Sequence, residues 1–101
     1  MIKQIAMWRL HESNKTENIG KMKTALLSMA GRVSSLDYIE VGTNISDSNS
    51  AYDIVFNGHF KDKKTLADFE ADKFHLSIWR FVSGIRDKRV VVDYELLGTG
   101  V

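Results

Sequence analysis

Residues 36–60 constrain the fold of this chain more than any other stretch. Two segments rich in β-branched and aromatic residues, 36–43 and 52–60, flank eight residues dominated by Ser, Asn and Asp. This composition is typical of two antiparallel strands joined by a solvated loop. The Asn57-Gly58 pair falls inside the second segment, where a turn would leave very short strands, so we predict a β-bulge there.

One strand and one helix are predicted before this stretch. Residues 2–10 carry apolar side chains at both odd and even positions, as a strand covered on both faces would. From Asn14 to Met29, apolar residues recur at intervals of three and four, which predicts an amphipathic helix. Asn14 and Glu17 match the spacing of a capping box, and Gly31 is placed to end the helix in the left-handed conformation.

A second helical region and a last strand are predicted after it. Residues 65–86 have helical periodicity but two separate apolar stripes, which predicts two helices with a break near Asp72 and Lys73. Residues 88–95 include three consecutive valines and are predicted to form the last strand.

The order of elements is strand, helix, strand, strand, helix, strand, which is the ferredoxin-like arrangement. We therefore predict an α+β fold with a four-stranded antiparallel sheet and helices on one face only. The other face would expose Trp8, the valines 90–92 and apolar residues of 52–60. A symmetric homodimer formed through this sheet face would cover them.

Composition limits the function classes. A chain of 101 residues fits one domain, which we place at residues 1–95, with 96–101 as a C-terminal tail. The net charge of +1 gives no electrostatic basis for binding nucleic acid or a membrane. The absence of cysteine excludes disulfides and thiolate chemistry, and no signal peptide or membrane span is recognisable, so we expect a cytoplasmic protein.

Three patches carry a family resemblance. They are Glu40-Val-Gly-x-Asn44-x-Ser46, then Tyr52-Asp53, and then His75 before an apolar helix with the later run Arg89-Val-Val-Val-Asp-Tyr94. In this order and spacing, the chain resembles the stress-responsive α/β-barrel family over about residues 1–95. The resemblance implies a dimeric α+β barrel.

The resemblance also implies candidate site residues. The family includes a plant polyketide cyclase in which a histidine and a tyrosine of the second helical segment, and a histidine of the first strand, act on the substrate. His75 corresponds to the helical histidine, whereas Phe69 stands in the place of the tyrosine and Gln4 in that of the strand histidine. Because two of the three polar groups are replaced, only His75 is carried over as a candidate.

His75 is the candidate general base, since an imidazole can take up and return a proton near neutral pH. Asp72, three residues earlier, could hold its second nitrogen only if the helix break permits. The structural alternative is that His75 fastens the break between the two helices by bonding a backbone carbonyl.

Four further residues are predicted to line a ligand pocket with His75: Gln4, Met22, Phe69 and Trp79. Trp79 lies one helical turn after His75, and the pair could border an aromatic ligand. The structural alternatives are that Trp79 packs in the core and that the Gln4 amide only bonds its neighbours.

No metal or other cofactor is expected, because the three histidines lack the spacing of a preformed metal site. Three functions remain open. The first is a small dimeric stress-responsive domain that binds a small apolar or aromatic ligand. The second is a cofactor-free, polyketide-cyclase-like enzyme with His75 as its base, and the third is a heme or quinol monooxygenase-like barrel. A ligand-sized cavity reaching the imidazole would favour an enzyme, and a filled core would favour the first function.

Overall fold

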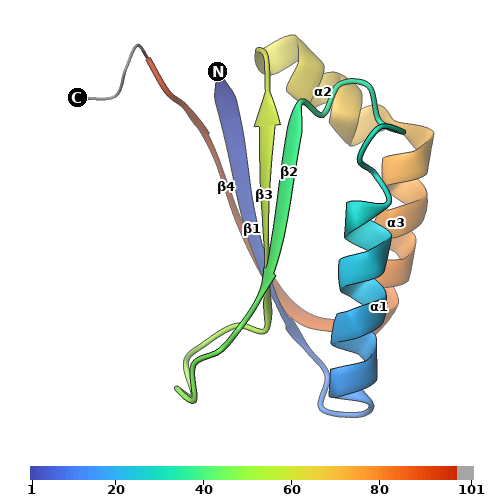
Figure 1. Ribbon diagram of the computed structural model, residues 1–101, viewed down its shortest axis with the longest axis vertical. Coiled ribbons are helices and arrows are strands. Elements are labelled where there is room, and N and C mark those ends of the chain that lie inside the picture. Colours follow the sequence, from blue (N-terminus) through green and yellow to red (C-terminus); the bar gives the residue numbers. More distant parts are fainter. Residues whose placement is uncertain (98–101) are drawn as a thin grey trace.

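The computed structural model describes residues 1–97, and of the predicted tail, 96–101, residues 98–101 lie outside this part. A four-stranded antiparallel sheet is covered on one face by three helices (Figure 1). In chain order the elements are β1 (Ile2–Leu10), α1 (Lys15–Leu27), β2 (Tyr38–Thr43), β3 (Ile54–Phe60), α2 (Lys63–Ala71), α3 (Lys73–Ile85) and β4 (Arg86–Glu95). The strands lie in the order β2-β3-β1-β4. The predicted α+β, ferredoxin-like fold is confirmed.

Burial alternates strictly along the two central strands. On β1 the even-numbered side chains face the helices, and on β3 the even-numbered ones do so too. The largest fully buried side chains between sheet and helices include Phe56, Phe60 and Phe69. This single layer of core holds α3 against the sheet and so positions the site described below.

The opposite face of the sheet is not covered by any helix of the described chain (Figure 1). We call it the open face, and its exposed apolar side chains are Met7, Tyr38, Val90, Val92 and Tyr94. Trp8, which was predicted to be exposed here, is instead buried on the helix side. The strand alternation decides this, because Trp8 shares its face with the buried Ala6 and Leu10.

Two predictions about the ends of α1 need correction. Asn14 precedes the helix in the left-handed conformation, with φ 56°, and its side chain makes no capping hydrogen bond. The helix ends at Leu27, and Gly31, with φ 76°, lies in the turn beyond it. A capping box does exist at α2, where the Asp62 side chain accepts from the Thr65 N–H and the Thr65 hydroxyl oxygen accepts from the Asp62 N–H.

The predicted bulge at Asn57-Gly58 is wrong, because both residues pair in regular register with β1. The glycine has a packing role instead. A Cβ at Gly58 would come within 2.5 Å of the Phe56 ring, which lies over it on the helix side of the sheet. The residue type is therefore explained by the close approach of an aromatic ring and not by a change in register.

No helix in residues 1–97 is long and apolar enough to cross a membrane.

Candidate functional site

The break between α2 and α3 places His75 in the first turn of α3. Asp72 ends α2 and caps α3, because its Oδ1 accepts the backbone N–H groups of Phe74 at 2.8 Å and His75 at 3.0 Å. The predicted break is thus confirmed, and the Asp72 carboxylate bonds the backbone of α3. The His75 ring packs against Phe69 of α2, with 4.1 Å between ring centroids.

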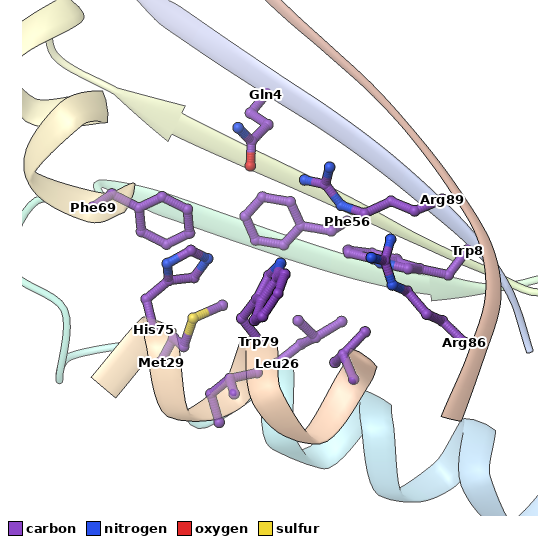
Figure 2. Close-up of a pocket in the computed structure, with 12 residues that line it drawn as sticks. Gln4, Trp8, Leu26, Met29, Phe56, Phe69, His75, Trp79, Arg86 and Arg89 are labelled. Atoms are coloured by element: carbon purple, nitrogen blue, oxygen red, sulfur yellow. The ribbon is translucent and has the colours of Figure 1, made fainter. Parts of the chain in front are cut away.

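His75 borders a cavity between α3 and the helix-facing side of the sheet (Figure 2). Its volume is about 30 Å³. Twelve residues line it: Gln4, Trp8, Leu26, Met29, Phe56, Phe69, His75, Ile78, Trp79, Val82, Arg86 and Arg89. Such a volume holds about one water molecule, and most ligand sites are about ten times larger or more. The cavity reaches the imidazole, but a ligand must open it further.

Four of the five predicted site residues meet at this cavity: Gln4, Phe69, His75 and Trp79. Met22 of α1 does not line it. Its side chain is 0% exposed and belongs to the hydrophobic core. The amphipathic pattern of α1 correctly marks Met22 as inward-facing, but it does not tell which inward-facing residue adjoins a cavity.

Several lining residues were not predicted, above all Arg86 and Arg89. A signal for Arg89 is present in the sequence. Alternation along β4 puts Arg89 on the same face as Asp93, and Asp93 pairs with Gln4 on the helix-facing side of the sheet. In the structure Arg89 pairs with Trp8 of β1, and its guanidinium carbon lies 5.9 Å from the Trp8 ring centroid. Arg86 immediately follows the end of α3, and a pattern of apolar residues does not reveal that it turns inward.

The electrostatics of His75 favour a neutral imidazole. Burial lowers the pKa of His75, and the positive charge of Arg89 acts in the same direction. The Asp72 carboxylate and the backbone of Glu70 and Phe69 oppose this shift but do not cancel it. The Nδ1 atom is buried without a hydrogen-bond partner among the described residues. A neutral imidazole is the form that can accept a proton, although use of His75 as a general base stays a prediction.

The two ends of the Gln4 amide have different surroundings. Its Nε2 donates a hydrogen bond to Asp93 Oδ1 at 2.8 Å, so one end of the amide is bonded within the sheet. Its carbonyl oxygen points toward the cavity (Figure 2). Gln4 thereby offers a hydrogen-bond acceptor to a ligand in a largely apolar space.

The two tryptophans of the chain both line the cavity. Trp8 is buried in the sheet, and its Nε1 has no hydrogen-bond partner within residues 1–97. Trp79 is 47% exposed, so it is not the core residue of the structural alternative. A half-exposed aromatic ring at the edge of a cavity can move aside at little packing cost.

The other patches of the family resemblance stabilise loops away from the cavity. Asp53 Oδ2 accepts the Leu10 N–H at 2.8 Å and lies 3.3 Å from Lys15 Nζ, so it ties β1 and the start of α1 together. Asn44 Oδ1 accepts the Ser46 N–H at 2.9 Å and forms a local turn. Within the described residues, no three His, Asp or Glu side chains converge in a way that could hold a metal ion.

Lowering the pH from 7 to 5 is expected to reduce the free energy of unfolding. Burial lowers the pKa of both His59 and His75, so the folded protein binds fewer protons than the unfolded chain below about pH 6.5. The stability that comes from keeping both imidazoles neutral in the folded protein is fully present above about pH 6.5. It is lost as the pH falls through the pKa values of these histidines in the folded protein.

Urea unfolding at several pH values measures the effect. His75→Gln should give a shallower loss of stability than the wild type, whereas His11→Gln, which changes an exposed histidine, should keep the wild-type slope. Equal slopes for His75→Gln and the wild type would refute the contribution of His75.

Comparisons with known proteins agree with this architecture. A sequence profile described as Stress responsive A/B Barrel Domain matches residues 2–96. A comparison with curated protein sequences finds no match for this chain.

Similar solved structures include a dimeric protein of unknown function with a ferredoxin-like fold from Bacteroides fragilis, with a TM-score of 0.84 and 20% identity over 94% of this chain and 95% of that one. A dimeric ferredoxin-like protein of unknown function from Thermobifida fusca has a TM-score of 0.84 and 17% identity over 94% of this chain and 90% of that one. A hydroxynitrile lyase from Passiflora edulis has a TM-score of 0.85 and 14% identity over 97% and 94%.

At these identities the solved structures establish the fold alone. The profile match extends over nearly the whole chain and includes all seven elements described above. This protein therefore belongs to the stress responsive A/B barrel domain family.

Proposed function

We propose that this protein is a homodimeric domain that binds a small apolar or aromatic molecule in the cavity between α3 and the sheet. The observation that carries the proposal is a pair of buried nitrogen atoms beside this cavity, Trp8 Nε1 and His75 Nδ1, which have no partner among the described residues. Buried polar atoms are normally hydrogen-bonded, so two such atoms on residues that line one cavity are explained by a ligand or water that bonds to them.

Entry of a ligand is proposed to depend on Trp79. The cavity of about 30 Å³ is too small for an aromatic ring, but the half-exposed indole forms part of its wall. Outward rotation of this one side chain would widen the cavity toward solvent and leave the buried core intact. The residues that would then contact the ligand include Phe56, Phe69 and Ile78.

The homodimer is proposed to form through the open face. A monomer would leave Met7, Val90 and Val92 in water next to one another, since Met7 and Val90 are directly opposite in the β1–β4 pair. Two buried polar atoms on the same side of the sheet, Asn57 Oδ1 and His59 Nε2, also have no partner within the described chain. A second copy could supply both the apolar cover and these hydrogen bonds.

Titration of the two tryptophans with 4-phenylbutanol tests the ligand proposal, because both indoles line the cavity. We expect a saturable change in fluorescence with a dissociation constant of roughly 1 mM or below, given the size of the probe. Ile78→Phe should weaken binding about tenfold or more, since Ile78 lines the cavity and the larger ring would fill it.

Leu76→Phe is the matched control, because Leu76 lies on the same helix but is exposed and does not line the cavity. It should bind the probe as the wild type does. Fluorescence that does not saturate, or equal binding by Ile78→Phe and the wild type, would refute binding in this cavity. Catalysis by His75 and a monooxygenase function stay predictions.

A further inference from the structure

We propose that the molecule held in this cavity is an acid, an apolar or aromatic body with one carboxylate-like group that Arg86 and Arg89 bind. This inference rests on the proposed function and adds the chemical class of the ligand. It concerns Arg86 and Arg89, the two arginines that line the cavity. The family resemblance does not assign either of them to a ligand pocket.

The sheet and α3 bring the two arginines to the same end of the cavity. Arg86 begins β4 directly after α3, and Arg89 is the direct partner of Trp8 in the β1–β4 pair. Both side chains line the cavity; the Arg86 guanidinium lies over Trp8, and the Arg89 guanidinium extends toward Phe56 and Gln4 (Figure 2). A guanidinium presents parallel N–H donors that match the two oxygens of a carboxylate.

Neither arginine has an acidic partner within 4.0 Å among residues 1–97. In the part of the chain that the structure describes, the ion pairs involve only lysines with Glu12, Glu17, Asp53 and Asp68. Burial lowers the pKa of Arg89 most, and the positive charge of Arg86 lowers it further, while Asp93 and Glu70 oppose the shift. The carboxylate of Asp93 accepts the hydrogen bond of Gln4.

Two partly buried like charges without a direct ion-pair partner are unfavourable in the free protein. An anion placed between them would relieve the repulsion and take up their unused donors. None of the twelve described residues that line the cavity is acidic, so no carboxylate among them would repel that anion.

The remaining lining fixes the shape of the ligand. Phe56 and Trp79 lie between the arginines and the opposite end, where His75 packs on Phe69 (Figure 2). A ligand with its acidic group at the arginines would place its apolar body between the aromatic side chains and its far end beside the His75 imidazole. The cavity is therefore expected to hold the ligand in one orientation, with its acidic group at the arginines and its far end at His75.

The test compares 4-phenylbutyrate, 4-phenylbutanol and 4-phenylbutylamine, which share the phenyl body and differ in the charge of the end group. Tryptophan fluorescence of the full chain reports binding of all three. In the wild type, the carboxylate should bind about tenfold to a hundredfold more tightly than the alcohol, as expected for charge-assisted hydrogen bonds, and the amine most weakly.

Arg86→Gln and Arg89→Gln should each remove most of this preference and leave the affinity for the alcohol within about twofold, because the apolar contacts remain. Arg80→Gln is the control, since it removes the same charge from an exposed position of α3 that does not line the cavity. It should keep the wild-type preference.

The outcomes separate the two proposals. If the alcohol and the acid bind equally well, or if both cavity variants keep the preference, the cavity binds ligands but the arginines do not select acids. If none of the three probes binds, the proposed function and this inference both fail.

Discussion

Replacing Phe69 with alanine is expected to lower the free energy of unfolding by about 3–5 kcal/mol. The Phe69 side chain is 1% exposed and joins α2 to both the sheet and α3. Its ring centroid lies 4.9 Å from that of Phe60, 6.2 Å from that of Phe56 and 4.1 Å from that of His75. Removing it would leave a large cavity in the core and take away the surface against which the imidazole packs.

Urea unfolding at fixed protein concentration measures this loss, since the concentration affects the apparent stability of a dimer. Phe81→Ala on α3 is the matched control, because Phe81 is 37% exposed and outside the buried core. It should change stability by about 1 kcal/mol or less. A similar loss in both variants would show that the Phe69 cluster does not hold the helices to the sheet.

Met7→Lys is expected to dissociate the dimer. Met7 lies on β1, near the centre of the open face, and is 39% exposed in the single chain, so a lysine fits the folded monomer. In the proposed dimer, each protomer would bury one such lysine, so the interface would contain two buried charges. The expected cost of a few kcal/mol would weaken dimerisation about a hundredfold or more.

Sedimentation or light scattering at micromolar concentration gives the mass, and circular dichroism verifies the fold. Leu76→Lys is the control, because Leu76 is similarly exposed, at 37%, but lies on α3 of the helical layer. It should remain dimeric. A Met7→Lys protein that keeps the mass of the wild-type dimer would place the interface elsewhere, and a monomeric wild type would refute the dimer.

Most of the fold follows from the sequence because the periodicities are local. The β-branched and aromatic segments and the helical spacing predicted the order of the elements, and the second apolar stripe located the break that Asp72 caps. The positions that failed depend on tertiary contacts. Asn57-Gly58 suggests a turn or bulge by composition, but the residue type at Gly58 is set by the Phe56 ring packed over it.

The contrast between local sequence patterns and tertiary contacts also explains which residues of the candidate site were missed. Gln4, Phe69 and His75 were named because they stand at the positions of the site residues in the resembled family, and Trp79 because it lies one helical turn after His75; the structure places all four at the cavity. The arginines were missed, since a guanidinium on an edge strand normally points to water. The size of the cavity could not be predicted at all, because it is a small difference between large packed volumes.

A crystal structure of the full chain grown with 4-phenylbutyrate tests the central claim most directly. We expect the phenyl ring between Phe56 and Trp79, with the Trp79 side chain turned outward from its position over the cavity. The Trp8 and His75 nitrogens that now lack partners should contact the ligand or a water molecule beside it. A saturating concentration of the ligand that leaves the cavity closed and Trp79 in place would contradict the account.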